Sequence, residues 1–508
     1  MTVRRKIWSI AASDSSAGAG SQADLRMAHA MNTDCGVLLI AVTAQSSAGV
    51  QAVEAVPATM LEQQWQALRQ DGWPAVIKIG WLPAERPLLS WLNAKLAEYP
   101  GPVIWDPVLS ASQGGLPQVR WPAAELQALL GRADLLTPNR AEALALSGLA
   151  PDTSLPRIAA QLQQLGAGHL LISGGDQDAA QVEDWFFFNP QRTLGEGQLP
   201  GPELLPQFGL RHTRIARRVH GTGCHLATAL ACGLAAGLTL YDAVVRAVTA
   251  ARLAIRHASA RSNGYDNAWA VDPETAAADD WPLVVSTGPV TGPLIAGTAT
   301  AGFPGVQRPL GLYGLVDNLT HLQRLLAEGI DTLQWRVKAP HGDYEHQTLQ
   351  AIERCRDAGV PLYINDDWQL ALRLGAYGVH LGQEDLLCAD LPALAAAGIR
   401  LGISTHSDWE IARARALQPS YIALGPVFIP LSKKLRYAPL GCAQLAVWAQ
   451  RFAAQRLTCI GGITPQNIAA VAAAGIDSAA VVTALQMDDG LEQRLQRLRD
   501  YCPPVNGS

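Results

Sequence analysis

Short apolar runs alternate with longer Ala- and Leu-rich stretches through the second half of the chain. Eight such runs follow one another: 311–316, 331–337, 361–365, 378–382, 400–404, 421–425, 457–462 and 478–485. Near-continuous apolarity is typical of strands buried on both faces, and the stretches between the runs have the composition of helices. We therefore expect a closed (β/α)8 TIM barrel here, with an open doubly wound sheet as the alternative.

The first half shows the same alternation, but its apolar runs are unevenly spaced. Seven runs are expected to be strands: 7–12, 37–43, 76–80, 102–105, 133–137, 169–173 and 184–188. Polar residues, among them Asp106 and Asn139, directly follow two of these runs. This pattern predicts an open α/β sheet that binds its ligand at the carboxyl ends of its strands.

An uncharged stretch rich in Gly, Pro, Thr and Ala separates the two halves, from Val284 to Gln307. Such a composition favours turns over regularly packed elements and indicates a domain boundary. We predict a first domain over 1–275, a linker over 276–308 and a second domain over 309–508.

The charge balance argues against nucleic acid and membrane partners. The chain has 39 Lys and Arg against 44 Asp and Glu, a net charge of −5, and so offers no general basic surface. The most membrane-like run, 226–240, is shorter than the ~20 residues that span a bilayer and predicts a buried helix. The eight cysteines include no Cys-x-x-Cys pair, which argues against a zinc site or a disulfide framework and favours the reducing cytoplasm.

A glycine-rich segment, VHGTGC at 219–224, runs directly into a helical stretch that begins near His225. Small residues let a ligand approach the backbone, and the free N–H groups of a helix start favour an anion such as phosphate. Cys224 is expected to have a lowered pKa there and to act as a base or to polarise a hydroxyl. A buried thiol without a chemical role is the alternative. The chain has no Walker A motif, which excludes a P-loop kinase.

Six segments of the first half resemble, in order, the hydroxymethylpyrimidine (phosphate) kinases of thiamin synthesis, which have a ribokinase-like fold. They are SDSSAGAGSQADL (13–25), VTAQSSAGV (42–50), IKIGWL (77–82), DPV (106–108), LLTPNRAEA (135–143) and HGTGC (220–224). The resemblance implies that Asp24 and Gln45 bind the aminopyrimidine and that Cys224 assists the attack on the γ-phosphate of ATP. An amide such as Gln45 suits an aminopyrimidine because it both donates and accepts. The resemblance assigns five further residues to Mg-ATP and its phosphates: Asp106, Asn139, Glu142, Gly221 and Gly223.

Three positions depart from this family. Ser173 stands where a lysine is usual, so one phosphate-side cation is missing. Trp81 replaces a methionine that lines the pyrimidine, which changes the pocket volume or adds a stacking face, and Ala17 replaces a loop glycine. We expect a kinase that is slow or altered in preference, and two alternatives stay open: a pyridoxal-type kinase and a non-catalytic pyrimidine-binding domain.

Polar residues follow four of the expected barrel strands at their carboxyl ends, where a TIM barrel holds its active site. They form four groups: Gln334, Arg336 and Lys338; Asn365 and Asp366; Gln383, Glu384 and Asp385; Ser404, Thr405 and His406. Carboxylates among cations suggest that a divalent metal such as Mg²⁺ joins the protein to a polyphosphate. Ordinary salt bridges at the barrel rim are the alternative.

The second half resembles thiamin phosphate synthase in seven segments: QWRVK (334–338), YINDD (363–367), GVHLGQEDL (378–386), GISTHS (402–407), ALGPVF (423–428), IGGITPQN (460–467) and AAVVTAL (479–485). The resemblance implies that Asp366 and Asp385 bind Mg²⁺. It surrounds the pyrimidine diphosphate with Gln334, Arg336, Lys338, Asn365, Ser404, Ser432 and Lys433. It assigns the thiazole phosphate to Gly462 and to the backbone of Val482 and Thr483.

The implied synthase reaction needs no protein nucleophile. The C–O bond of the pyrimidine diphosphate breaks early, and charge builds on the departing pyrophosphate, where Mg²⁺ with Arg336, Lys338 and Lys433 stabilises it. Pro430 replaces a threonine of the family, and Asp367 stands where arginine is common. These two changes predict weaker pyrophosphate binding or a higher Mg²⁺ requirement.

The patterns and resemblances together predict a bifunctional cytoplasmic enzyme. It phosphorylates hydroxymethylpyrimidine and its phosphate with ATP, then condenses the diphosphate with hydroxyethylthiazole phosphate to give thiamin phosphate and pyrophosphate. We expect small-molecule partners, Mg²⁺ in both domains, and a homodimer formed through the kinase domain.

Overall fold

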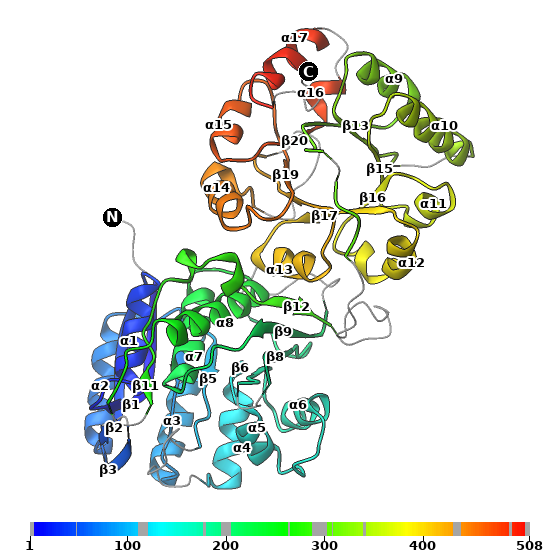
Figure 1. Cartoon of the computed structure of the whole chain (residues 1–508). Coiled ribbons are helices and arrows are strands. Elements are labelled where there is room, and N and C mark those ends of the chain that lie inside the picture. The colour runs from blue at the N-terminus through cyan, green and yellow to red at the C-terminus, as the bar shows by residue number, and fades with distance from the viewer. Residues whose placement is uncertain are drawn as a thin grey trace. The chain divides into compact units, whose positions relative to one another are not determined.

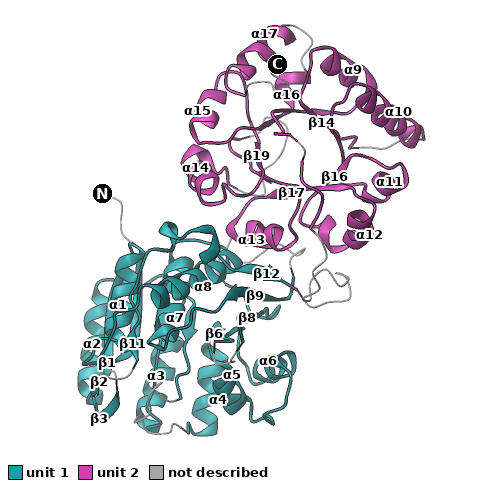
Figure 2. Cartoon of the chain, viewed as in Figure 1, with its two compact units in different colours: residues 1–285 teal, residues 286–508 magenta. Residues whose placement is uncertain are grey.

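The chain divides into two compact units, residues 1–285 (unit 1) and residues 286–508 (unit 2), shown in Figure 2. The computed structural model describes residues 5–46, 48–109, 120–175, 179–194, 205–262, 265–286, 302–306, 308–338, 342–429, 438–486 and 490–502. Each unit has its own sheet and its own helices (Figure 1).

Unit 1 contains one open sheet, which in its described part has ten strands in the order β12-β9-β8-β7-β6-β5-β4-β1-β2-β3. The strands are β1 (Lys6–Asp14), β2 (Asp34–Ser46), β3 (Gly49–Ala55), β4 (Val76–Ile79), β5 (Val103–Trp105), β6 (Leu135–Leu136), β7 (His169–Ile172), β8 (Gln181–Phe187), β9 (Gln207–Thr213) and β12 (Leu283–Val285). A separate pair joins β10 (Val219–His220) to β11 (Asp266–Asn267). The central strands are parallel, and β3, β8, β9 and β12 pair antiparallel. The seven predicted strands and the open α/β sheet are confirmed, and the five other strands are additions to the prediction.

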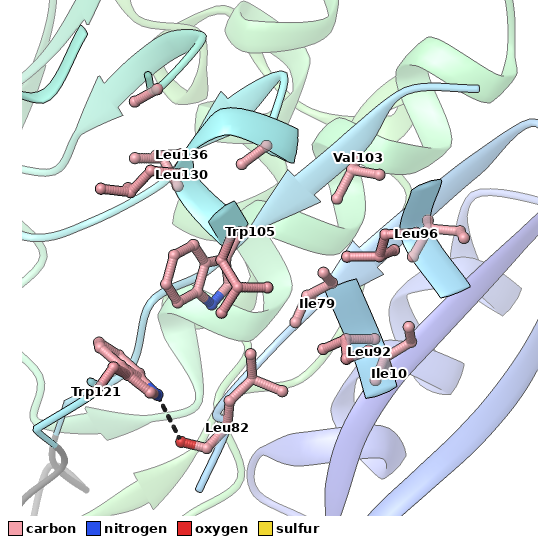
Figure 3. Close-up of a cluster of buried hydrophobic side chains, with 14 of the residues drawn as sticks. Ile10, Ile79, Leu82, Leu92, Leu96, Val103, Trp105, Trp121, Leu130 and Leu136 are labelled. Atoms are coloured by element: carbon pink, nitrogen blue, oxygen red, sulfur yellow. Dashed lines mark hydrogen bonds between the residues drawn. The ribbon is translucent and has the colours of Figure 1, made fainter. Parts of the chain in front are cut away.

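Successive side chains along β1 point to opposite faces of the sheet, so one face is apolar and the other carries a polar side chain. Trp8 and Ile10 of β1 point into a large apolar cluster, whereas Ser9 between them faces the helix on the other side. The helices of unit 1 are α1 (Gly20–Ala30), α2 (Ala58–Gln70), α3 (Arg86–Glu98), α4 (Ala123–Arg132), α5 (Arg140–Ser147), α6 (Leu155–Gln164), α7 (Thr222–Ala235) and α8 (Leu240–Arg256). In Figure 3, Trp121 lies beside Trp105 within this cluster, and its indole N–H donates to the carbonyl of Leu82 at 3.3 Å.

The run 226–240 is buried over 226–235 as predicted, but Gly237 is exposed and the run is not one helix. Helix α7 ends at Ala235, and Thr239 begins α8 as its N-cap, because its side-chain oxygen accepts a hydrogen bond from the Asp242 N–H. In the parts of the chain that the structure describes, we find no helix that is both long and apolar enough to cross a membrane.

Unit 2 is a closed barrel of parallel strands, so the open-sheet alternative is wrong. Its strands, eight in the described residues, are β13 (Leu312–Val316), β14 (Thr332–Trp335), β15 (Leu362–Asn365), β16 (Gly378–Leu381), β17 (Arg400–Thr405), β18 (Tyr421–Leu424), β19 (Leu457–Ile460) and β20 (Ala479–Val481). Strand β13 pairs with both β14 and β20, which closes the ring. The helices around it are α9 (Leu319–Ala327), α10 (Tyr344–Asp357), α11 (Trp368–Arg373), α12 (Leu391–Ala396), α13 (Asp408–Ala416), α14 (Gly441–Arg451), α15 (Ile468–Ala473), α16 (Thr483–Gln486) and α17 (Leu491–Arg499). Figure 1 shows the strands inside this ring of helices.

Both ends of the predicted linker, 276–308, belong to the units themselves. Strand β12 pairs antiparallel with β9, which extends the first unit to Val285, ten residues beyond the predicted end at 275. On the other side, the Phe303 N–H donates to the Gln418 carbonyl, and Ser420 Oγ donates to the Pro304 carbonyl at 2.6 Å. The division between the two units falls inside the uncharged stretch, and strand pairing and barrel contacts take up both ends of the predicted linker.

Candidate active sites

A cavity of about 800 Å³ lies at the carboxyl ends of the parallel strands of unit 1. Eight of the nine residues predicted for the kinase half line it: Gln45, Trp81, Asp106, Asn139, Glu142, Gly221, Gly223 and Cys224. Ser173 lines it as well. The ninth predicted residue, Asp24, does not.

The glycine-rich segment forms the start of α7 as expected. Gly221 is the N-cap in the left-handed region, with φ of +85°, and a Cβ there would come 1.9 Å from the Gly18 carbonyl oxygen. Only glycine fits this position, which brings the 15–19 loop against the helix start. The first N–H groups of α7 have no partner within the helix, so Gly223 and its neighbours offer donors to an anion in the cavity.

Cys224 does not have the lowered pKa predicted from its place at a helix start. Burial raises the pKa of its thiol to about 12, and the nearby carboxylates of Asp106 and Asp24 add to this, against the opposing effect of Lys78. The helix N-terminus is outweighed because the thiol is almost surrounded by protein. Cys224 is therefore a neutral thiol at physiological pH.

Asp106 is the second cavity residue whose pKa is raised. Burial raises its pKa to about 6, although Lys78 works in the opposite direction. Its Oδ2 atom is buried and has no hydrogen-bond partner within the described residues. A Cβ on Gly223 would lie 3.6 Å from the Asp106 carboxylate, so the carboxylate faces the start of α7 closely.

Asp24 is fully buried and does not line the cavity, so the predicted contact with the pyrimidine stays a prediction. Its carboxylate accepts hydrogen bonds from Ser9 Oγ at 2.5 Å, Thr228 Oγ1 at 2.7 Å and Lys78 Nζ at 2.9 Å. These three side chains and Asp24 have no exposed surface. The carboxylate is fully occupied in joining α1, β1, β4 and α7.

Lys78 is a cavity residue that the sequence analysis did not identify. Burial opposes its charge, but Asp24 and Asp106 outweigh that effect and raise the pKa of its ammonium group. Its signal in the sequence was a lysine inside the apolar strand VIKI, because a charge buried in a central strand requires a partner.

Gln45 is held by residues that also escaped the sequence analysis. Its Nε2 lies 2.9 Å from His220 Nε2, and Asp14 Oδ2 lies 3.4 Å from the same histidine atom. The Gln45 backbone donates to and accepts from Ser15 Oγ, at 2.8 and 2.7 Å. The end of β2, the 15–19 loop and β10 therefore meet at Gln45.

Asn139 and Glu142 form a capping box at the start of α5. Asn139 accepts from the Glu142 N–H, and Glu142 accepts from the Asn139 N–H, both at 2.8 Å. They line the cavity while supporting the helix. Ser173 carries no positive charge. Besides Lys78, the cationic residues that line the cavity are Arg214, Arg217, Arg218 and Arg252.

In unit 2, the two predicted metal ligands lie beside each other. Burial raises the pKa of Asp366 to about 6, the neighbouring Asp385 carboxylate raises it further, and Arg336 works against both. Asp366 adopts a φ of +64°, in the left-handed region, and its N–H donates to the His380 carbonyl. Asp385 accepts from the Gly382 N–H at 2.9 Å. No third His, Cys, Asp or Glu completes a metal-binding group in the portion of the chain described.

The remaining barrel predictions fall at strand ends or outside the described residues. Asn365 ends β15, Arg336 and Lys338 follow β14, and Gly462 follows β19, with its carbonyl accepting from Asn467 Nδ2. Val482 lies between β20 and α16, and Thr483 is the first residue of α16. Ser432, Lys433 and Pro430 lie outside the described residues.

Asp367 has a structural role that the sequence comparison did not indicate. Its side chain is the N-cap of α11 and accepts from the Leu370 N–H at 2.9 Å. An arginine could not provide this cap. The predicted effect of Asp367 on pyrophosphate binding stays a prediction.

Gln334 and Ser404 point into the barrel interior, where further polar side chains meet them. Gln334 Nε2 donates to Tyr313 Oη at 3.3 Å, and Ser404 Oγ lies 2.8 Å from His380 Nε2. Tyr313 and His380 were not singled out by the sequence analysis, because buried aromatic residues on barrel strands resemble ordinary core.

The two units match two different families of known proteins. A family model for phosphomethylpyrimidine kinase matches residues 14–268, and one for thiamine monophosphate synthase matches residues 314–485. The thiamine-phosphate synthase of Yersinia pestis is 47% identical over 190 residues, 37% of this chain and 88% of the relative. That of Salmonella agona is 47% identical over 198 residues, 39% of this chain and 94% of the relative.

Two solved structures are similar to the first unit. Pyridoxal kinase from Staphylococcus aureus in complex with pyridoxal is 25% identical, with a TM-score of 0.44, covering 52% of this chain and 93% of that chain. Phosphomethylpyrimidine kinase from Clostridium difficile is 27% identical, with a TM-score of 0.39, covering 48% and 96%.

Proposed function

The chain belongs to the phosphomethylpyrimidine kinase family and continues into a thiamine monophosphate synthase domain, and on this premise we propose which residues perform its two reactions. The protein is a bifunctional enzyme of thiamine biosynthesis. Its kinase domain phosphorylates the hydroxymethylpyrimidine phosphate with ATP. Its synthase domain joins the diphosphate to hydroxyethylthiazole phosphate and releases pyrophosphate.

In the kinase domain, the pyrimidine binds at Gln45 and Trp81, and the phosphates of ATP bind at the start of α7. The observation that supports this most is that both groups line one cavity. Gln45 offers a fixed amide to the aminopyrimidine edge, because His220 and Ser15 restrain it. The N–H groups around Gly221 and Gly223 stabilise charge on the transferred phosphoryl group.

Cys224 acts as a neutral thiol in this proposal. Because burial raises the pKa of its thiol, it donates a hydrogen bond to the substrate oxygen and orients that oxygen toward the phosphoryl group. Asp106, Asn139 and Glu142 face the same cavity on the nucleotide side. A Mg²⁺ ion that accompanies ATP would lie beside Asp106, whose unpartnered Oδ2 is available to it.

In the synthase domain, Asp366 and Asp385 are the proposed Mg²⁺ ligands. Burial and the neighbouring Asp385 carboxylate raise the pKa of Asp366, and a divalent cation relieves the repulsion between the two carboxylates, so the residues fit the ion. Such an ion, when bound, neutralises charge on the pyrophosphate oxygens. Arg336, Lys338 and Lys433 bind the same oxygens, Asn365, Ser404, Ser432 and Gln334 hold the pyrimidine diphosphate, and Gly462, Val482 and Thr483 hold the thiazole phosphate.

The test supplies the full chain with hydroxymethylpyrimidine, hydroxyethylthiazole phosphate, ATP and Mg²⁺, and measures thiamin phosphate. We expect Cys224→Ala to lower the kinase step alone and Asp366→Ala to abolish the synthase step alone, so added hydroxymethylpyrimidine diphosphate restores product only with Cys224→Ala. Absence of product with the unaltered protein, or turnover of pyridoxal in preference to hydroxymethylpyrimidine, contradicts the proposal.

The proposed setting is the cytoplasm, with the kinase domain self-associating as a homodimer. All eight cysteines are free thiols, which suits a reducing compartment. Leu25 on α1 and Val42 on β2 expose 43% and 49% of their surface, and both belong to the kinase domain. Light scattering on the full chain tests the dimer, and a monomer mass overturns it.

A further inference from the structure

A line of hydrogen bonds crosses the interior of the barrel and connects two of the proposed substrate-binding residues. It starts at Gln334 on β14, whose Nε2 donates to Tyr313 Oη at 3.3 Å. Tyr313 Oη and Tyr421 Oη are 2.8 Å apart, Tyr421 Oη lies 2.8 Å from His380 Nδ1, and His380 Nε2 lies 2.8 Å from Ser404 Oγ. The residues come from β13, β14, β16, β17 and β18.

The side chains of this line are buried, and the surrounding barrel residues leave space for them. Tyr313, Tyr421, Gln334 and His380 are all buried, with between 1% and 7% of their surface exposed. A Cβ on Gly402 would lie 2.2 Å from Tyr421 Cζ, so only glycine at this position leaves space for the phenol. The His380 ring stacks on Tyr421, with centroids 5.7 Å apart and an interplanar angle of 21°.

The hydrogen-bond inventory of these groups favours one direction of the line, because the other leaves the Tyr313 hydrogen without an acceptor among the described residues. Each phenol has one hydrogen, and a neutral histidine has one N–H. Because Gln334 donates at one end, Tyr313 donates to Tyr421, and Tyr421 donates to His380 Nδ1. His380 Nε2 then carries the ring hydrogen and donates to Ser404 Oγ.

We propose that Tyr313, Tyr421 and His380 are positioning residues of the synthase reaction, which keep the Ser404 hydroxyl as a hydrogen-bond donor and the Gln334 carbonyl as a free acceptor. The proposal rests on the proposed function. An acceptor at Gln334 matches the amino group of an aminopyrimidine, and a donor at Ser404 matches an oxygen of its diphosphate. Reversing the line would direct the Ser404 hydrogen into the protein and leave the substrate oxygen without it.

Tyr363 provides a matched control. It belongs to the same buried aromatic cluster, with its ring centroid 5.0 Å from that of Tyr421. Its hydroxyl is buried but has no hydrogen-bond partner among the residues described. Tyr363→Phe therefore removes a buried phenol hydroxyl of the same barrel layer without interrupting the line.

The experiment measures synthase kinetics of the full chain with supplied hydroxymethylpyrimidine diphosphate and hydroxyethylthiazole phosphate. We expect Tyr421→Phe and Tyr313→Phe each to lower kcat by about tenfold, while Tyr363→Phe changes it less than about twofold. Calorimetry of the same preparations is expected to show an unchanged melting transition of the barrel, which shows that the substituted unit is folded. If the unaltered protein forms no thiamin phosphate, the proposed function fails; if it does and Tyr421→Phe matches Tyr363→Phe, only the positioning role fails.

A double-mutant cycle decides whether the line acts through Ser404. In a Ser404→Ala background, Tyr421→Phe is expected to have no further effect on kcat, because the hydroxyl that it positions is gone. A Tyr421→Phe loss of the same factor in both backgrounds would overturn the proposal, since it would indicate a general effect on barrel packing.

Discussion

Cys224 shows how one residue's surroundings can reverse an expectation drawn from its place in a motif. A helix start lowers a thiol pKa, but burial beside two carboxylates raises that of Cys224 to about 12. The neutral thiol is therefore the dominant form of Cys224 at about pH 8.

This protonation predicts slow alkylation. On treatment with iodoacetamide at about pH 8, the exposed Cys388 should react well before Cys224, because the thiolate is the nucleophile. Peptide mass spectrometry at several times measures both. Labelling of Cys224 as fast as that of Cys388 would show that an ionised thiol is present in the free enzyme.

Asp106 carries a pH-dependent cost in stability. Its pKa is about 6 in the folded chain against an ordinary value of 3.8. The cost in folding stability is therefore absent below about pH 4, where the acid is protonated in both the folded and the unfolded chain, and it is complete once the pH has risen through 6. The difference amounts to about 3 kcal/mol. Asp106→Asn, which stays neutral, should therefore raise the melting temperature of the free enzyme more at about pH 8 than at about pH 5. Equal shifts at the two pH values, measured by calorimetry, would contradict this.

At the scale of elements, the buried Asp24–Lys78 pair joins α1 to β4, with Ser9 of β1 and Thr228 of α7 completing the group. Removing one charge leaves the other buried and unpaired, at a cost of about 3–5 kcal/mol. Lys78→Met should therefore strongly lower the melting temperature of the kinase domain. The double variant Asp24→Leu/Lys78→Met should recover most of the loss. A double variant as unstable as Lys78→Met would show that the charges are not the cause.

The elements that the sequence predicted best are those buried on both faces. All eight barrel strands are found because their runs are continuously apolar. Strand β9 reads QFGLRHT and β3 reads GVQAVEA, and both mix exposed with buried residues near a sheet edge, so neither has a continuously apolar run.

The residues that surround the two sites could not be predicted from the sequence for another reason. His220 meets Gln45 across 175 positions and Tyr421 meets Tyr313 across 108, and no local pattern encodes such contacts.

At the scale of the whole molecule, the stability of each unit depends on residues at the ends of the segment that joins the two units. Residues 302–306 pack on the barrel through Phe303, Pro304 and Gly305, and β12 covers the edge of β9. The pieces 1–285 and 302–508 keep these contacts and should therefore each melt in one cooperative transition.

The shorter pieces, 1–275 and 309–508, should melt at lower temperatures, because one loses an edge strand and the other loses contacts to Gln418, Ser420 and Arg400. Calorimetry of the four pieces measures this. A piece 309–508 as stable as 302–508 would mean that those contacts contribute nothing to the barrel.

The backbone of Asp366 has a consequence for anyone who engineers this enzyme. Its left-handed φ of +64° suits glycine, and an L-residue there costs about 1 kcal/mol or more. Asp366→Gly should thus raise the melting temperature while ending thiamin phosphate synthesis, and a variant with unchanged activity would contradict the assignment. Selection for thermostability alone would favour the inactive glycine variant, so a screen at this position has to score turnover together with heat resistance.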